Sequence, residues 1–195
     1  MRRRAWIAAG LLLALPASAW QGARLAERAH DDREITYDLG DPTSHAFEVR
    51  HTNTENRLGL DRYTETVRQG STVASVTARN LDTGEALPAE IRKGEEGKDT
   101  VVVRLPPIPE GGSVRFRASE AYADPQAYRL EEDGLVFDRI LGRARNTVIL
   151  PAGWYLTAAS MPAMVSETPD GRIRLDFVNP RNDNVAALIK ARRRP

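Results

Sequence analysis

The stretch Ser113-Val-Arg-Phe-Arg-Ala-Ser119 alternates apolar with polar residues over its whole length. A second stretch, Arg172-Ile-Arg-Leu-Asp-Phe177, repeats this alternation. Because successive side chains of a β-strand point to opposite faces, each stretch predicts a strand with one buried and one solvated face. Such strands are typical of antiparallel sheets, since parallel sheets are covered on both faces and show continuous apolar runs.

Similar short runs, rich in β-branched residues, recur from Glu34 onward and are separated by Gly, Pro, Asn and Asp. We expect strands at 44–52, 63–69, 71–79, 100–105, 113–119, 135–141, 147–150, 172–178 and 185–191. Asp82-Thr83-Gly84, Asp133-Gly134 and Asp170-Gly171 supply residues that tight turns require. The sequence therefore predicts an all-β fold, an antiparallel two-layer β-sandwich of immunoglobulin-like or related type.

The N-terminal segment 1–19 has the three parts of a cleaved secretory signal. Arg2 to Arg4 are the charged part, 5–15 is the apolar part, and Ala17-Ser18-Ala19 is the small-residue cleavage site. The apolar part is too short for a membrane span, which needs about 20 residues in a helix. We therefore expect a periplasmic or secreted protein with no stable membrane span after cleavage.

The remaining chain divides by composition into a polar, Ala-rich leader at 20–33, which could include a short helix, and a β-sandwich domain at 34–195. The stretch 120–126 is the candidate seam if this domain is divided. With 41% apolar and 28% charged residues, the composition is that of a globular protein.

Charge and cysteine content exclude several classes of function. The absence of cysteine excludes disulfides, thiol nucleophiles and Cys-ligated zinc. Loss of Arg2 to Arg4 with the signal leaves 25 basic against 27 acidic residues, which argues against a nucleic-acid partner. We expect no cofactor.

Three segments of the C-terminal half resemble uncharacterised exported bacterial β-sandwich proteins and, more distantly, the N-terminal β domains of gluzincin aminopeptidases. They are Asn146-Thr-Val-Ile-Leu-Pro-Ala-Gly-Trp154, Met161-Pro162-Ala163 and Pro169-Asp-Gly-Arg-Ile-Arg-Leu-Asp-Phe-Val-Asn-Pro180. In gluzincin aminopeptidases the metal lies in another domain. Because the zinc motif His-Glu-x-x-His is absent here, the resemblance implies an accessory or binding domain without peptidase activity.

His45 and His51 lie at either end of an alternating segment and are expected on one face. Six residues separate them by roughly 20 Å, so they cannot share a metal ion, and no metal site is assigned. If 44–52 pairs antiparallel with the next strand, Tyr63 and Glu65 lie on the same side as His51. Glu65 would then have a raised pKa, or would be neutralised by His51 or an arginine. A register slip of one residue would reverse this face.

Further candidate binding residues are aromatic or basic. Trp154 and Tyr155 are adjacent on a strand and therefore point to opposite faces, so one ring could stack on a ligand. The basic candidates are Arg139, Arg143 and Arg145, together with Arg192 to Arg194. They could contact an anionic envelope surface. Alternatively, Arg139 points into the sheet, Arg143 and Arg145 lie on a turn, and the C-terminal triplet is a disordered, solubilising end.

No catalytic residue is assigned, because the sequence has no Gly-x-Ser-x-Gly elbow and no readable triad. The leading hypothesis is an exported, non-catalytic β-sandwich that binds or scaffolds an unidentified protein or other component of the cell envelope. The alternative is a hydrolase or a hydrolase-accessory domain, associated with peptidases or glycans.

The first testable prediction concerns processing. Ala17 and Ala19 occupy the two small-residue positions before the expected cleavage site, so the mature N-terminus should be Trp20. Intact-mass measurement of the exported protein checks this. A mass that includes 1–19 would contradict the prediction.

Overall fold

The computed structural model describes residues 33–94, 98–132, 134–179 and 184–194. The expected signal 1–19 lies outside these residues, as does the leader 20–33 apart from Arg33. In the described part of the chain, no helix is both long and apolar enough to cross a membrane.

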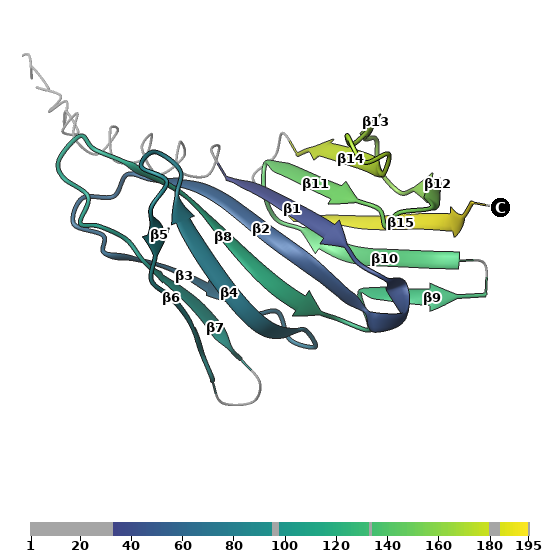
Figure 1. The fold of residues 1–195 in the computed structure, drawn as a ribbon, viewed down its shortest axis with the longest axis horizontal. Helices are drawn as coiled ribbons and strands as arrows, with labels where there is room; N and C mark the ends of the chain where they lie inside the picture. Colours follow the sequence, from purple (N-terminus) through teal and green to yellow (C-terminus); the bar gives the residue numbers. More distant parts are fainter. Residues whose placement is uncertain (1–32, 95–97, 133, 180–183, 195) are drawn as a thin grey trace, which may run out of the picture.

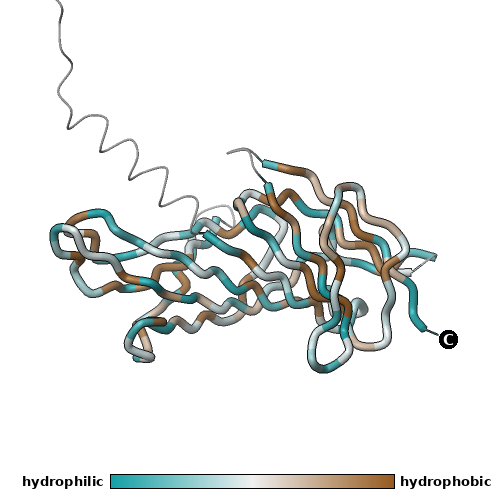
Figure 2. Tube along the Cα trace, turned by 90° about the horizontal axis from the view of Figure 1, so that it is seen from above, coloured by the Kyte–Doolittle hydropathy of each residue, from teal (hydrophilic) through white to brown (hydrophobic). Residues whose placement is uncertain are grey.

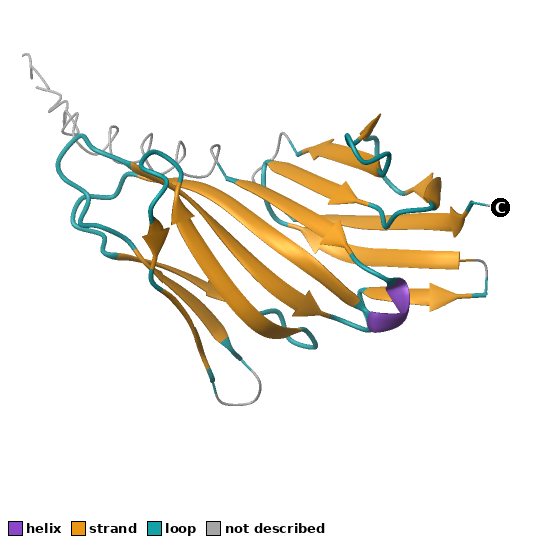
Figure 3. Cartoon of the chain, in the orientation of Figure 1, coloured by secondary structure: helices purple, strands orange, loops and turns teal. Residues whose placement is uncertain are grey.

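Three sheets make up the fold of the described residues (Figures 1 and 3). The largest has the order β13 (Met164–Glu167), β14 (Ile173–Val178), β11 (Arg145–Ile149), β1 (Glu34–Leu39), β2 (Ala46–Glu55), β8 (Val114–Ala123), β4 (Thr72–Asn80) and β5 (Ala86–Leu87). A four-stranded sheet has the order β12 (Trp154–Ala159), β15 (Val185–Arg193), β10 (Gly134–Leu141) and β9 (Tyr128–Glu131). The third has the order β3 (Arg62–Thr66), β7 (Thr100–Arg104) and β6 (Ala89–Arg92).

Alternation along the strands creates the two faces of the large sheet. In β2 every second residue from Phe47 to Glu55 is buried, and in β8 every second residue from Val114 to Tyr122 is buried. Hydrophobic and hydrophilic residues accordingly alternate along the chain in Figure 2. The other face carries charged pairs, such as Asp38 with Arg50 at 3.0 Å. The large sheet therefore has one inner and one solvated face.

Both small sheets cover the inner face of the large sheet, at different ends. On one side, Tyr63 of β3 packs against Phe116 of β8, with ring centroids 5.2 Å apart. On the other side, Phe137 of β10 packs against Tyr37 of β1 and Phe47 of β2, at 5.5 and 5.9 Å. These contacts belong to one hydrophobic cluster, so the molecule is a sandwich with a divided second layer.

The predicted all-β, sandwich-like fold is confirmed. Every segment expected to be a strand overlaps an observed strand, although not all pairs are antiparallel. Strands β1 and β11 pair in parallel, with Glu34 opposite Arg145. Two parallel strands need a long crossover, here most of the chain, so local alternation could not indicate this pair.

The expected pairing of 44–52 with 63–69 is wrong. β2 pairs with β1 and β8, whereas β3 pairs with β7 in a different sheet. The start of the first segment also differs, because Pro42–Ser44 forms a 3-10 turn ended by His45, whose φ is 55°. His45 therefore precedes β2 and does not continue its alternation.

Packing of the aromatic cluster leads to a prediction about stability. Phe137 is fully buried and contacts three other rings, so Phe137→Ala should lower the free energy of unfolding by about 3–5 kcal/mol. Tyr155→Ala is the control, because this residue is 37% exposed, and should change stability little. Urea denaturation of the mature chain measures both. Equal losses in the two variants would contradict this description of the core.

Candidate functional site

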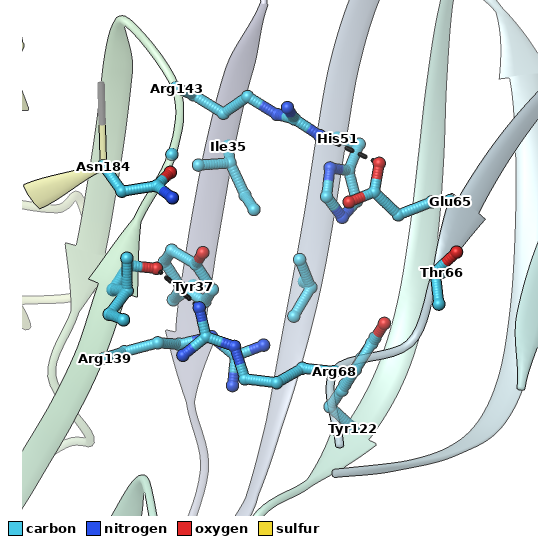
Figure 4. A pocket seen from close by; sticks show the side chains of 13 residues that line it. Ile35, Tyr37, His51, Glu65, Thr66, Arg68, Tyr122, Arg139, Arg143 and Asn184 are labelled. Atoms are coloured by element: carbon cyan, nitrogen blue, oxygen red, sulfur yellow. Dashed lines mark hydrogen bonds and ion pairs between the residues drawn. The ribbon is translucent and has the colours of Figure 1, made fainter. Parts of the chain in front are cut away.

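The second layer of the sandwich is interrupted between the two small sheets. The gap contains a cavity of about 260 Å³, whose lining residues come from β1, β2 and β8 beneath it and from the two small sheets beside it. Figure 4 shows the residues Ile35, Tyr37, Val49, His51, Glu65, Thr66, Arg68, Tyr122, Arg139, Ile140, Gly142, Arg143 and Asn184. We call this feature the inter-sheet groove.

One rim of the groove is an ion pair that joins the two small sheets. Arg143, which follows β10, donates from Nη2 to Oε2 of Glu65 in β3 at 2.8 Å. The hydroxyl of Tyr63 donates to the same carboxylate oxygen at 2.5 Å. Burial and the Glu65 charge raise the pKa of Tyr63, so it remains a hydrogen-bond donor at neutral pH. The ion pair expected for Glu65 is therefore present, with Arg143 as its partner.

Arg139 is anchored deep in the wall of the groove. Its guanidinium lies 3.3 Å from Oδ2 of Asp124, and the side chains are only 8% and 4% exposed. The same guanidinium lies over the rings of Tyr37, Phe47 and Tyr122, at 5.2–5.8 Å from their centroids. A buried charge with both an ion pair and aromatic faces around it is well stabilised. Arg139 is thus part of the core and not of a basic surface.

Arg68 lies across the groove from the strand that carries Arg139. It donates from Nη2 to the carbonyl oxygen of Ile140 at 3.1 Å. No carboxylate of the described residues lies within ion-pair distance of it. Burial and the charge of Arg139 lower the pKa of Arg68, which indicates that its positive charge is poorly compensated.

The floor of the groove contains a buried histidine, and beside it on the neighbouring strand β8 lies a buried glutamate that does not line the cavity. Nε2 of His51 lies 3.9 Å from Oε1 of Glu120, and neither side chain is more than 5% exposed. Among the described residues, Nδ1 of His51 and both carboxylate oxygens of Glu120 have no hydrogen-bond partner. Burial lowers the pKa of His51 to about 4 and raises that of Glu120 to about 7. At neutral pH the imidazole is therefore uncharged, and Glu120 is close to its own pKa.

A second hollow of about 590 Å³ continues the groove beyond Glu65. Its lining residues are Arg33, Arg57, Leu60, Arg62, Tyr63, Thr64, Glu65, Thr66 and Arg143. Arg57 is paired with Glu55 and Arg62 with Asp61, whereas Arg33 has no carboxylate partner among the described residues. The two ends of the groove thus each carry an uncompensated arginine, Arg33 and Arg68.

The structure brings together four of the candidate residues from the sequence. His51, Tyr63, Glu65 and Arg143 lie at the two adjoining hollows, although β2 and β3 do not pair. They meet because the three-stranded sheet packs over the inner face of β2. This close approach came from packing between layers and not from the hairpin that the sequence suggested.

The other candidates lie outside the groove. Trp154 is buried under Arg193, whose guanidinium lies 5.6 Å from its ring, and Tyr155 points outward. Arg145 pairs with Glu34 at 2.7 Å on the solvated side. Arg192 and Arg193 belong to β15, so the expectation of a disordered C-terminal triplet is wrong for these two residues.

Glu120, Arg68 and Tyr122 are site residues that the sequence reasoning missed. A signal for two of them was present, since the alternation of 114, 116 and 118 continues to Glu120 and Tyr122. Arg68 follows a short strand and had no such signal. Among the described residues, no group of three or more His, Cys, Asp and Glu side chains could hold a metal ion.

Comparison with known proteins gives similarity of fold alone. No protein-family model matches the sequence, and no curated protein matches it. The chain is similar to an M1 zinc metallopeptidase from Deinococcus radiodurans, with a TM-score of 0.49 and 16% identity over 80% of this chain and 40% of that chain. It is also similar to a two-domain M1 zinc metallopeptidase mutant bound to L-tryptophan, with a TM-score of 0.48 and 17% identity over 80% and 41%.

The similar region in these M1 peptidases, which are gluzincins, is their N-terminal β region. This chain spans about two fifths of their length. At this score and identity the similarity carries no argument about activity.

The His51 and Glu120 pair leads to a prediction about pH. The folded pKa of His51 is lowered, so its contribution to stability increases as the pH rises from about 4 to about 6.5. The folded pKa of Glu120 is raised, so its contribution decreases as the pH rises from about 4.5 to about 7. In the wild type the two contributions largely cancel between pH 4.5 and 6.5.

Glu120→Gln removes one of these contributions. As the pH rises from 4.5 to 6.5, the free energy of unfolding of this variant should increase by about 2 kcal/mol more than that of the wild type, because the His51 contribution is no longer cancelled. Urea denaturation at a series of pH values measures this difference. Parallel pH profiles for the two proteins would show that Glu120 does not titrate as described.

Proposed function

We propose that the protein is an exported, non-catalytic binding protein of the cell envelope, and that its ligand binds in the inter-sheet groove. The observation that carries the proposal is the set of polar groups without partners at this groove. Arg68 lacks a carboxylate partner among the described residues, and His51 and Glu120 keep buried polar atoms without hydrogen bonds.

Groups of this kind are costly in a closed core. A buried polar atom that loses its hydrogen bond destabilises a protein by about 1–3 kcal/mol. Buried polar groups without hydrogen bonds therefore need an explanation, and such groups concentrate at functional sites. A ligand in the groove that supplies a hydrogen-bond partner to His51, which lines it, would remove part of this cost on binding.

The proposal assigns binding rather than catalysis because of the residues that line the groove. The described lining contains no serine or cysteine that His51 could activate, and the Glu65 carboxylate is held by Arg143 and Tyr63. These side chains are arranged to recognise a ligand. The sequence at 1–19 supports export to the envelope.

In-cell photo-crosslinking tests the groove as the binding site. A benzoylphenylalanine is introduced at Thr66, which lines the groove, or at Ala121, which is exposed on the solvated face of β8. Irradiation of exporting cells should give an adduct from Thr66 that is several-fold stronger than any from Ala121. Adding Arg68→Gln should weaken this adduct.

Two results would contradict the proposal. Equal adducts from both positions, or no adduct from either, would show that the groove is not the ligand site. Turnover of peptide or ester substrates by the purified mature protein, lost in Glu120→Gln, would replace binding with catalysis.

A further inference from the structure

Strand β3 has a free edge that faces the inter-sheet groove. It is the last strand of its sheet and pairs only with β7 among the described strands. The carbonyl oxygen of Asp61 accepts a hydrogen bond from the backbone N–H of Leu105, and the N–H of Val67 donates to the carbonyl oxygen of Asp99. The odd-numbered residues of this segment therefore direct their backbone N–H and C=O groups toward β7. Since backbone groups alternate in direction along a strand, those of Thr64 and Thr66 point to the free edge.

Strand β10 presents a second free edge at the same groove. Its first half pairs with β9 at 134–137, but 138–141 pairs only with β15 among the described strands. The carbonyl of Ile140 consequently accepts its hydrogen bond from the side chain of Arg68. A guanidinium thus occupies the place that a backbone N–H of a neighbouring strand would take.

The surroundings of the two edges favour an acidic occupant. Arg33 and Arg68 lie at opposite ends of the groove, each without a carboxylate partner among the described residues. Arg139 and Arg143 add positive charge to the wall between them. Each of these two has one carboxylate partner, Asp124 and Glu65, so the four arginines outnumber their partners. Acidic side chains of a ligand would neutralise the remaining positive charge.

We propose that the inter-sheet groove binds an extended, acidic peptide segment of a partner protein by strand addition to β3. This inference rests on the proposed function and names its ligand class. The added strand pairs with the free backbone groups of Thr64 and Thr66 on one side. On its other side, a backbone N–H replaces the guanidinium of Arg68 at the Ile140 carbonyl, and Arg68 turns to an acidic side chain of the peptide.

Side chains of the added strand that face inward lie over the floor of the groove. His51 is there, 4% exposed, with Nδ1 free of hydrogen bonds to the described residues. A polar inward side chain would therefore find a partner, while Val49 and Ile35 offer apolar contact to its neighbours. The backbone supplies affinity, and alternate side chains supply specificity.

Binding of synthetic peptides to the mature protein tests the inference. The probe is a blocked peptide of alternating Glu and Val, long enough to pair with the 5 residues of β3. One control peptide carries Lys in place of Glu, and another keeps the Glu residues but is N-methylated on every second amide. Calorimetry should show saturable binding of the first peptide, no binding of the Lys peptide, and binding at least about tenfold weaker after N-methylation on the pairing amides.

Thr64→Pro provides a matching change in the protein. The N–H of Thr64 points to the free edge, so proline there removes no bond to β7 and is tolerated on an edge strand. It should weaken peptide binding about tenfold, whereas Thr64→Ala, which keeps the N–H, should have little effect. Urea denaturation of both variants verifies that they are folded. If Thr64→Pro does not fold, the N-methylated peptide gives the same information.

Two results would overturn the inference. One is binding of the Glu peptide that is insensitive to N-methylation and to Thr64→Pro, which would indicate charge attraction alone. The other is no binding of the Glu peptide. If the photo-crosslink at Thr66 persists in either case, the proposed binding function survives and only strand addition fails.

Discussion

The structure depends on burying one wide face of the large sheet. Alternation in β1, β2 and β8 gives the large sheet an apolar inner face, and neither small sheet is broad enough to bury it alone. Each therefore covers one end through its own ring contacts, Tyr63 with Phe116 and Phe137 with Tyr37. Because burial of this area is the main stabilising contribution to a sandwich, the positions of both small sheets follow from the pattern on the large one.

The same constraint explains why polar residues appear in the middle of the inner face. Along β2 the inward residues change from Phe47 and Val49 to His51, and β8 contributes Glu120, which lies opposite Val49. These residues lie where cover from one small sheet ends and that from the other begins. Both side chains are nevertheless buried, and Glu120 is 0% exposed. The junction of the two covers therefore encloses polar groups whose burial is costly unless they are hydrogen-bonded.

The sequence predicted those features that depend on neighbouring residues. Period-two alternation identified the strand from 114 and the faces of its side chains, and Gly84 and Gly171 have the positive φ angles that their turns suggested. Partners distant in sequence could not be predicted, because pairing of β1 with β11 depends on the whole sheet being assembled. His51 and Glu65 were expected to be close through a hairpin, but they approach through layer packing, which no local pattern encodes.

The groove differs in rigidity between its wall and its rim. Breaking the buried pair of Arg139 and Asp124 would leave an uncompensated charge, which typically costs about 3–5 kcal/mol, so this wall is fixed by folding. The pair of Arg143 and Glu65 is more accessible to water, at 19% and 27% exposed, so breaking it leaves its charges less deprived of solvent. Arg68 is held by a single bond to a carbonyl. The contacts that span the groove can therefore rearrange for a ligand without loss of the fold, whereas the contacts that shape its wall cannot.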